Sequence, residues 1–187
     1  MIDIKRVTSI AELAGIKQLQ QANLRGWLSP QEKDREGFVT AEYSLEFLQL
    51  MHDAEPSIIA TDGEEVVGYA LVATRSVSRQ HELLQYLFDV IDSTHYGGQA
   101  LRDQPYVVVG QLCVSKNYRG MGLVQRMYDC YRQHLSGLYR YCLTDIDEKN
   151  PRSLKAHLKS GFRILDTLHY EGSNWYIVIW DWNNALH

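Results

Sequence analysis

A short glycine-containing segment in the second half of the chain has the composition of an anion-binding site. It reads Arg119-Gly120-Met121-Gly122-Leu123-Val124 and follows an apolar run at 106–114 that predicts a buried strand. Glycines let the backbone approach a ligand closely, and the free amides and positive dipole end of a helix that begins there attract phosphate or pyrophosphate. The order strand, turn and helix therefore predicts a phosphate site, although a plain tight turn explains so short a pattern equally well.

A second segment downstream combines helix signals with a histidine. Asn150 precedes a predicted helix at 151–159, Pro151 occupies its first turn, and Gly161 follows its end, as these residue types usually do. His157 lies within this helix. A histidine in such a place is usually structural, but its reference pKa of about 6.5 also allows it to donate a proton near neutral pH.

The surrounding chain predicts the strands and helices that would position these segments. Ser9 and Glu12 form a capping-box pattern that starts a helix, and Asp62-Gly63 between two β-rich runs indicates a hairpin. Gly110, inside the strand at 106–114, predicts a bulge. Strands are expected at 2–7, 57–61, 66–72, 106–114, 139–146, 163–170 and 175–182, and further helices around 45–51, 80–91, 122–134 and 151–159.

One domain covering residues 1–187 accounts for the whole chain. Its length of 187 residues, with 45% hydrophobic and 22% charged residues, is typical of a globular protein with one full-sized core. The helical run at 80–91, closed by Gly97-Gly98, indicates an insertion at about 80–101, and the polar residues 29–37 indicate a loop. Strands and helices together predict an α/β fold.

Composition argues against several classes of function. The formal net charge is −4 and no long basic run is present, which disfavours nucleic-acid binding. The three cysteines lack CxxC spacing, so neither a disulfide framework nor a metal site is expected. No apolar run approaches the ~20 residues of a membrane span, and no signal-peptide pattern is found, so we expect a cytoplasmic protein with no membrane partner.

The two segments together resemble the motifs of the GNAT acetyltransferases. The first motif of this family reads R/Q-x-x-G-x-G/A after a buried strand, and residues 119–124 match it except that Val124 stands where glycine or alanine is preferred. The second motif reads roughly N-x-x-A/S-x-x-x-Y-x-x-x-G-F, and residues 150–162 match it except that His157 replaces the tyrosine. The motifs lie at the family's usual separation, whereas the first half of the chain matches only in the order of its elements.

The resemblance implies a fold and a cofactor. The GNAT fold is a mixed, mostly antiparallel sheet of six to seven strands flanked by helices, with a V-shaped splay between strands 4 and 5, and the cosubstrate is acetyl-CoA. By this resemblance the pantetheine arm pairs with the backbone of the bulged strand at Leu112, Cys113 and Val114. The pyrophosphate is bound mainly by backbone amides, from Arg119, Gly120, Met121, Gly122, Leu123 and Val124. The far end of the cofactor contacts Asn150 and Ser153.

The catalytic groups are less clearly indicated. The match to the family's tyrosine implies that His157 protonates the departing CoA thiolate. A general base is harder to identify, because the strand at 106–114 carries no carboxylate and Gln111 cannot accept a proton. The candidates, each more often only a solvated charge, are Glu82, Asp89, Asp145 and Asp147.

Two further groups of side chains have ordinary structural explanations. Cys113 could carry an acyl group as a nucleophile, but its place in the strand favours a small core residue. The C-terminal aromatic residues fit sheet packing, namely Trp175, Tyr176, Trp180 and Trp182.

We therefore expect an N-acetyltransferase in which a primary amine attacks the thioester directly, aided by proximity and by backbone polarisation of the carbonyl. Small amines, amino acids, antibiotics and protein amino groups all remain open as acceptors, and edge strands near the C-terminus allow a homodimer. The alternative is a non-catalytic acyl-CoA-binding module, which the missing tyrosine and missing strand carboxylate favour. A dinucleotide-dependent oxidoreductase is set aside, because no GxGxxG follows an early strand with an acidic residue about 20 residues later.

Overall fold

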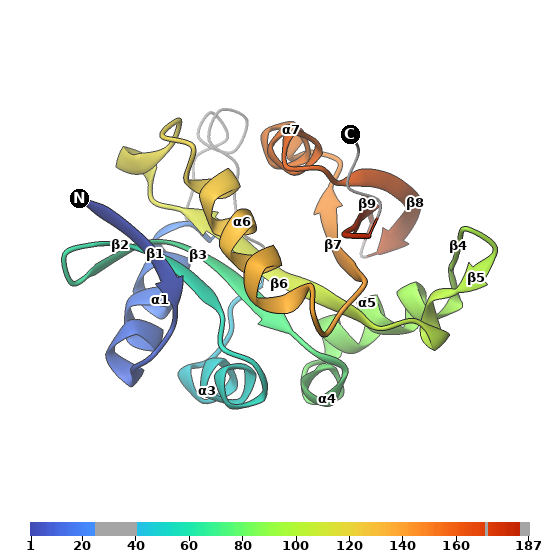
Figure 1. The fold of residues 1–187 in the computed structure, drawn as a ribbon, viewed down its shortest axis with the longest axis horizontal. Helices are drawn as coiled ribbons and strands as arrows, with labels where there is room; N and C mark the ends of the chain where they lie inside the picture. The colour runs from blue at the N-terminus through green and yellow to red at the C-terminus, as the bar shows by residue number, and fades with distance from the viewer. Residues whose placement is uncertain (25–40, 171, 184–187) are drawn as a thin grey trace.

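A seven-stranded sheet runs through the molecule in the order β1-β2-β3-β6-β7-β9-β8 (Figure 1). The structure is a computed structural model and describes residues 1–24, 41–170 and 172–183. The strands are β1 (Ile2–Arg6), β2 (Ile58–Asp62), β3 (Glu65–Ala73), β6 (Tyr106–Val114), β7 (Tyr141–Asp147), β8 (Arg163–Tyr170) and β9 (Ser173–Asp181). Within this described sheet, all neighbours are antiparallel except β6 and β7, which confirms the predicted mixed, mostly antiparallel architecture.

Helices cover both faces of the sheet. Figure 1 shows α1, α3, α4 and α5 gathered on one side and α6 and α7 on the other. The described helices are α1 (Ile10–Ala22), α3 (Leu45–Ala54), α4 (Arg75–Ser78), α5 (Glu82–Ser93), α6 (Leu123–Leu135), α7 (Pro151–Lys159) and the 3₁₀ turns η2 (Leu101–Asp103) and η3 (Lys116–Tyr118). Each layer closes its own apolar core, because alternate residues of a strand point to opposite faces. No helix in the described ranges is long and apolar enough to cross a membrane.

The local signals in the sequence act much as predicted. The Ser9 side chain accepts from the Glu12 amide and the Glu12 carboxylate accepts from the Ser9 amide, so the capping box is present. The hairpin loop is Gly63-Glu64, one residue later than predicted, because Asp62 already pairs with Glu65. The predicted loop at 29–37 lies outside the described residues.

The insertion between β3 and β6 contains more than a helix. After α5 the chain forms a small hairpin of β4 (His95–Tyr96) and β5 (Gln99–Ala100). Gly97 and Gly98 make its turn with φ of +60° and +79°, which side chains rarely adopt. These glycines therefore form a hairpin turn and do not simply end the helix.

The sheet splits between β6 and β7. These strands pair only from Tyr106 opposite Tyr141 to Val108 opposite Leu143, and then diverge. The register between β3 and β6 shifts at the same place, so that Gly110 and Gln111 together face a single residue of β3. A bulge bends the strand that carries it, which explains why β6 turns away from β7 at Gly110. The predicted bulge and splay are both confirmed.

Hydroxyl groups take over from the missing strand ladder at the split. Tyr131 donates to the carbonyl of Val108 (3.0 Å) and Thr144 donates to that of Val109 (2.8 Å). Tyr43 donates to the carbonyl of Gly110 (3.2 Å). A buried carbonyl without a donor is costly, so these side chains from α6, β7 and the segment before α3 stabilise the open sheet.

Removing one of these hydroxyls should destabilise the protein. In Thr144→Val the side chain keeps its shape but the buried carbonyl of Val109 loses its donor, so the free energy of unfolding should fall by about 1–3 kcal/mol. Urea unfolding measures this change. Tyr86→Phe is the control, because Tyr86 is exposed, and a change below about 0.5 kcal/mol is expected there. Equal urea midpoints for Thr144→Val and the wild type would contradict the role of Thr144 as the donor to the Val109 carbonyl.

Candidate functional site

A groove of ≈ 320 Å³ opens beside the diverging end of β6. Met121 is 56% exposed and does not line this groove. The structure brings the other predicted cofactor residues together around it, namely Leu112, Cys113, Val114, Arg119, Gly120, Gly122, Leu123, Val124, Asn150 and Ser153. Segments that are far apart in the sequence thus form one concave surface.

The turn before α6 presents backbone groups to this groove. Gly120 and Gly122 have φ of +82° and +73°, and nothing lies within 4 Å of a Cβ added at either. Glycine is therefore required for the backbone conformation and not for lack of room. Gly122 is the N-cap of α6 and no side chain caps the helix, so its first amides are suited to bind an anion. Val124 also lines the groove, with its side chain partly packed on the core.

Arg119 shapes the groove through contacts with the protein. Its Nε donates to the carbonyl of Val114 (3.0 Å), and its Nη2 donates to the side chain of Asn23 (2.7 Å) at the end of α1. The guanidinium thereby fixes the end of β6 against α1. Its charge still faces the groove, which Arg119 lines.

Several residues that line the groove were not predicted from the sequence. Arg152, Ala156 and Lys159 of α7 line the groove with Ser153, and they form a stripe at helical spacing. This spacing would have identified them once α7 was predicted. Asn23 and Tyr118, also part of the lining, carry no comparable signal. The groove therefore contains two cationic side chains of α7 in addition to Arg119.

A second, smaller cavity of ≈ 80 Å³ lies deeper in the split. Leu112, Asn150 and Ser153 line both this cavity and the groove, so the two spaces adjoin through the gap between β6 and β7. The other lining residues come from the segment before α3, from α5, β6, β7, α7 and β9, namely Ala41, Tyr43, Leu83, Leu84, Leu87, Gly110, Gln111, Thr144, Asp145, Ile146, Asp147, His157 and Trp175.

The four carboxylates predicted as general-base candidates are now distinguishable. Glu82 and Asp89 are exposed on α5 and do not line the cavity. Asp147 lines it, but one carboxylate oxygen accepts from the Lys149 amide (2.9 Å) as part of the turn after β7. Asp145 also lines the cavity, and burial raises the pKa of its carboxyl group to about 6. A carboxylate with that pKa is poised to exchange protons near neutral pH.

A polar network that sequence reasoning missed fixes the opposite wall. The Gln111 side chain accepts from Gln20 (2.9 Å) and from the Tyr69 hydroxyl (2.7 Å), and it donates to the carbonyl of Ala41 (2.8 Å). Gln20 in turn accepts from the amide of Tyr43 (2.9 Å). Gln111 thus holds Ala41 beside the bulge directly, and Gln20 holds Tyr43 there.

His157 is buried, with 3% of its surface exposed, and both of its ring nitrogens are bonded within the protein. The Tyr128 hydroxyl lies 2.7 Å from Nε2, and Nδ1 lies 2.8 Å from the carbonyl of Ser153. A single tautomer satisfies both contacts, with Nδ1–H donating and Nε2 accepting. Burial lowers the pKa of His157 to about 4, so the ring is neutral at neutral pH. These features argue against the predicted role as proton donor and favour a role in attaching α7 to α6.

Cys113 and the C-terminal aromatic residues were expected to have packing roles, and all but one of them do. Cys113 is buried, and burial raises its thiol pKa to about 12, so it is a poor nucleophile. Trp180 and Trp182 pack in the core beneath α6, and Tyr176 packs against it. Trp175 is the exception because it lines the small cavity. Within the described ranges, no cluster of His, Cys, Asp or Glu could hold a metal ion.

The sequence and the fold both match known proteins. A family model described as the acetyltransferase (GNAT) family matches residues 21–162. A GNAT family acetyltransferase from Streptococcus agalactiae has a TM-score of 0.66 at 16% identity, over 96% of this chain and 95% of that one. The ribosomal-protein-S18-alanine N-acetyltransferase from Escherichia coli has a TM-score of 0.64 at 10% identity, over 97% and 94%. Arabidopsis thaliana NAA60 in complex with acetyl-CoA has a TM-score of 0.60 at 18% identity, over 97% and 99%.

At these identities the structural likeness shows a shared fold. A search by sequence among curated proteins finds no significant match.

The environment of His157 predicts a pH-dependent stability. A buried histidine with a folded pKa near 4 stabilises the protein above its unfolded pKa of about 6.5, and this contribution of up to about 3 kcal/mol is lost as pH falls toward 4. The destabilisation caused by His157→Gln should therefore be larger at pH 7 than at pH 4.5. Urea unfolding of both proteins at the two pH values measures it, and other titrating groups cancel in the difference. A difference that does not vary with pH would contradict the neutral, buried ring.

Proposed function

The chain belongs to the GNAT acetyltransferases, because the model of that family matches residues 21–162, and we propose that it transfers an acetyl group from acetyl-CoA to a primary amine. One observation carries this proposal. The split between β6 and β7 connects two spaces. One is the groove, which is suited to an anionic cofactor, and the other is the small cavity, which contains a carboxylate. Such an arrangement brings a thioester and an amine together at the point where the two spaces meet.

The groove supports the cofactor half of the proposal. Beyond Val108 the described part of the chain places no strand beside the β7-facing edge of β6, so the extended, amide-containing pantetheine arm can pair with Leu112 to Val114. The first turn of α6 suits the pyrophosphate of CoA. Arg152 and Lys159 supply positive charge for the third phosphate of CoA, which is separate from the pyrophosphate. The solved structure of the Arabidopsis relative with acetyl-CoA supports this choice of cosubstrate.

Asp145 is our candidate for the general base. An alkylamine arrives as an ammonium ion, since the reference pKa of such a group is about 10.4. The Asp145 carboxylate takes one proton from the ammonium, the neutral nitrogen attacks the thioester carbon, and the C–S bond breaks as the C–N bond forms. The second nitrogen proton passes to the thiolate or to water, and Asp145 then loses its proton to solvent. Cys113 carries no acyl group in this scheme.

The leaving thiolate does not require a strong acid. A thiol has a reference pKa of about 8.5, so the thiolate is a stable leaving group close to neutral pH. The neutral ring of His157 is not suited to protonate it, because its N–H is bonded to the Ser153 carbonyl. We therefore propose that the thiolate takes its proton from the attacking nitrogen or from water.

A non-catalytic acyl-CoA-binding module remains the rival function. In the sequence, this function was favoured by the lack of the family's tyrosine at position 157 and by the lack of a carboxylate on β6. Asp145 supplies a carboxylate from β7 instead, beside the same split. This observation favours catalysis over simple binding.

Cofactor binding should depend on the turn before α6. CoA should raise the melting temperature of the wild type, because a ligand that binds only the native state stabilises it. Gly122→Glu should abolish the CoA-induced shift by placing a negative charge at the N-terminus of α6. Thermal unfolding with and without CoA measures both.

Two controls separate charge from backbone strain. Gly122→Ala imposes strain at φ +73° without charge, and should lower the melting temperature while retaining part of the shift. Gly137→Glu adds the same charge beyond the end of α6, away from the groove, and should retain all of it. A full shift in Gly122→Glu would rule out the turn as the pyrophosphate site.

Catalysis should depend on Asp145 in a pH-dependent way. Asp145→Asn should lower kcat by roughly 10²–10⁴-fold, the scale of a lost general base, and leave the CoA-induced thermal shift unchanged. Since the base acts when deprotonated, wild-type kcat/KM should fall as pH drops below about 6. Thiol release from acetyl-CoA measures both effects. Asp89→Asn, at an exposed position of α5, is the matched control. Near-normal turnover in Asp145→Asn would show that water or another group is the general base.

A further inference from the structure

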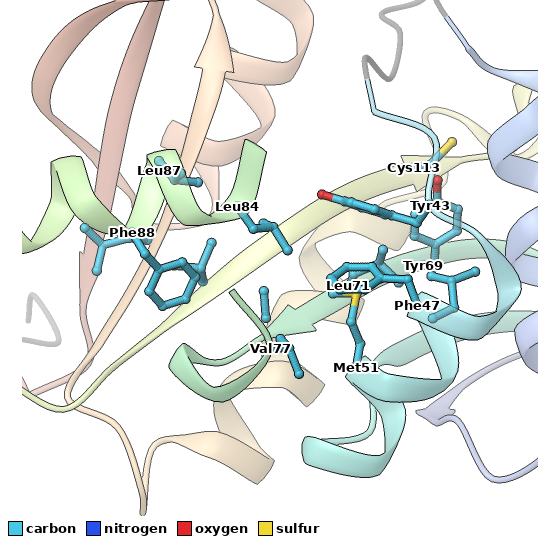
Figure 2. Packing of buried hydrophobic residues seen from close by; sticks show 14 of the residues in the cluster. Tyr43, Phe47, Met51, Tyr69, Leu71, Val77, Leu84, Leu87, Phe88 and Cys113 are labelled. Carbon is cyan, nitrogen blue, oxygen red and sulfur yellow. The ribbon is translucent and has the colours of Figure 1, made fainter. Parts of the chain in front are cut away.

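The small cavity has an apolar wall on the side of the insertion. α5 contributes Leu83, Leu84 and Leu87, while Trp175 of β9 and the ring of Tyr43 contribute further apolar surface. In Figure 2 the hydroxyl end of Tyr43 points toward Leu84. An acceptor that enters this cavity therefore has hydrocarbon on one side and Asp145 on the other.

The wall is held firmly in place. Asp92 of α5 accepts from Arg75 (2.5 Å) and from the hydroxyl of Tyr106 on β6 (2.7 Å), and the Arg75 guanidinium stacks over the Tyr106 ring. Leu84, Leu87 and neighbouring residues of α5 are buried in the core. These contacts make α5 a fixed wall of the small cavity.

The charged side chains among the described residues that line the cavity have one sign. Asp145 and Asp147 line it, His157 is neutral, and no lysine or arginine is found among the described lining residues. An ammonium group is complementary to the Asp145 carboxylate. A carboxylate beside the acceptor nitrogen, as in a free amino acid, would instead lie close to Asp145.

The size of the cavity limits the group that carries the amine. Its ≈ 80 Å³ is well below the ~300 Å³ at which pockets for drug-sized molecules begin. The space suits an amine and a few carbon atoms. A bulkier acceptor would have to extend out of the cavity, away from the leucines.

We infer that the acceptor is a primary amine carried on a short apolar group, with no carboxylate next to the nitrogen. This inference rests on the proposed acetyl transfer and gives it a substrate class. The apolar wall disfavours polar amines and the Asp145 carboxylate disfavours amino acids, while the small volume limits the part of the acceptor that the cavity holds.

A matched set of acceptors tests the inference. Isoamylamine, leucinamide and leucine share one side chain and differ in the group beside the amine, which is hydrogen, a neutral amide or a carboxylate. Thiol release from acetyl-CoA should give the highest kcat/KM with isoamylamine and a value at least about 100-fold lower with leucine, because like charges in contact cost several kcal/mol. Leucinamide should fall between them.

Variants at Leu83 test the cause of the discrimination. Leu83 is only half-buried, so it tolerates change better than Leu84. Leu83→Arg places a cation at the cavity and should raise leucine turnover relative to isoamylamine by about tenfold, by supplying the missing partner for the carboxylate. Leu83→Gln, polar but uncharged, should leave the ratio near that of the wild type.

The outcomes separate the two proposals. Equal use of leucine and isoamylamine overturns the acceptor class while leaving acetyl transfer intact. Preference for a leucine-initiated peptide over isoamylamine also overturns it, in favour of a protein amino terminus. If no acceptor releases CoA although CoA still raises the melting temperature, acetyl transfer is wrong and the acceptor class falls with it.

Discussion

A β-sheet that opens in its middle leaves backbone groups without partners on both sides of the opening, and the rest of this molecule depends on how they are satisfied. At the start of the split, the carbonyls of Val108, Val109 and Gly110 accept from hydroxyls of Tyr131, Thr144 and Tyr43. These donors come from α6, β7 and the segment before α3, so the split is stable only when these three elements are in place. Further along β6 the edge has no such cover from β7 and is available to a ligand.

The chemistry follows from the position of the split. The same divergence that exposes β6 also places Asp145 of β7 in a cavity from which water is partly excluded, and this burial raises its pKa to about 6. The groove beside Gly122 and the cavity beside Asp145 meet at Leu112, Asn150 and Ser153. In the proposed reaction, cofactor and acceptor approach from opposite ends of one opening, and proximity can supply a large part of the catalysis.

Local patterns predicted most of the fold and many of the residues that line the groove. The apolar run with Gly110 predicted β6 and its bulge, and helix signals predicted α7 residue for residue. The small cavity depends on contacts between residues far apart in the chain, such as Gln20 with Gln111, which no local pattern encodes. Choosing among the four carboxylates required their burial, and the role of His157 required its partners, Tyr128 and the Ser153 carbonyl. Burial and hydrogen bonding depend on the assembled core, so sequence reasoning could name these residues without ranking them.

Residue-resolved amide hydrogen exchange, with and without saturating CoA, tests most directly whether the open edge of β6 is the binding surface. If the pantetheine arm pairs with this edge, amide exchange in the segment from Leu112 to Val114 should slow when CoA binds. Amides from Tyr106 to Val108, a segment that already pairs with β7, should change little. Unchanged exchange from Leu112 to Val114 at saturating CoA would show that the split in the sheet is not where the cofactor binds.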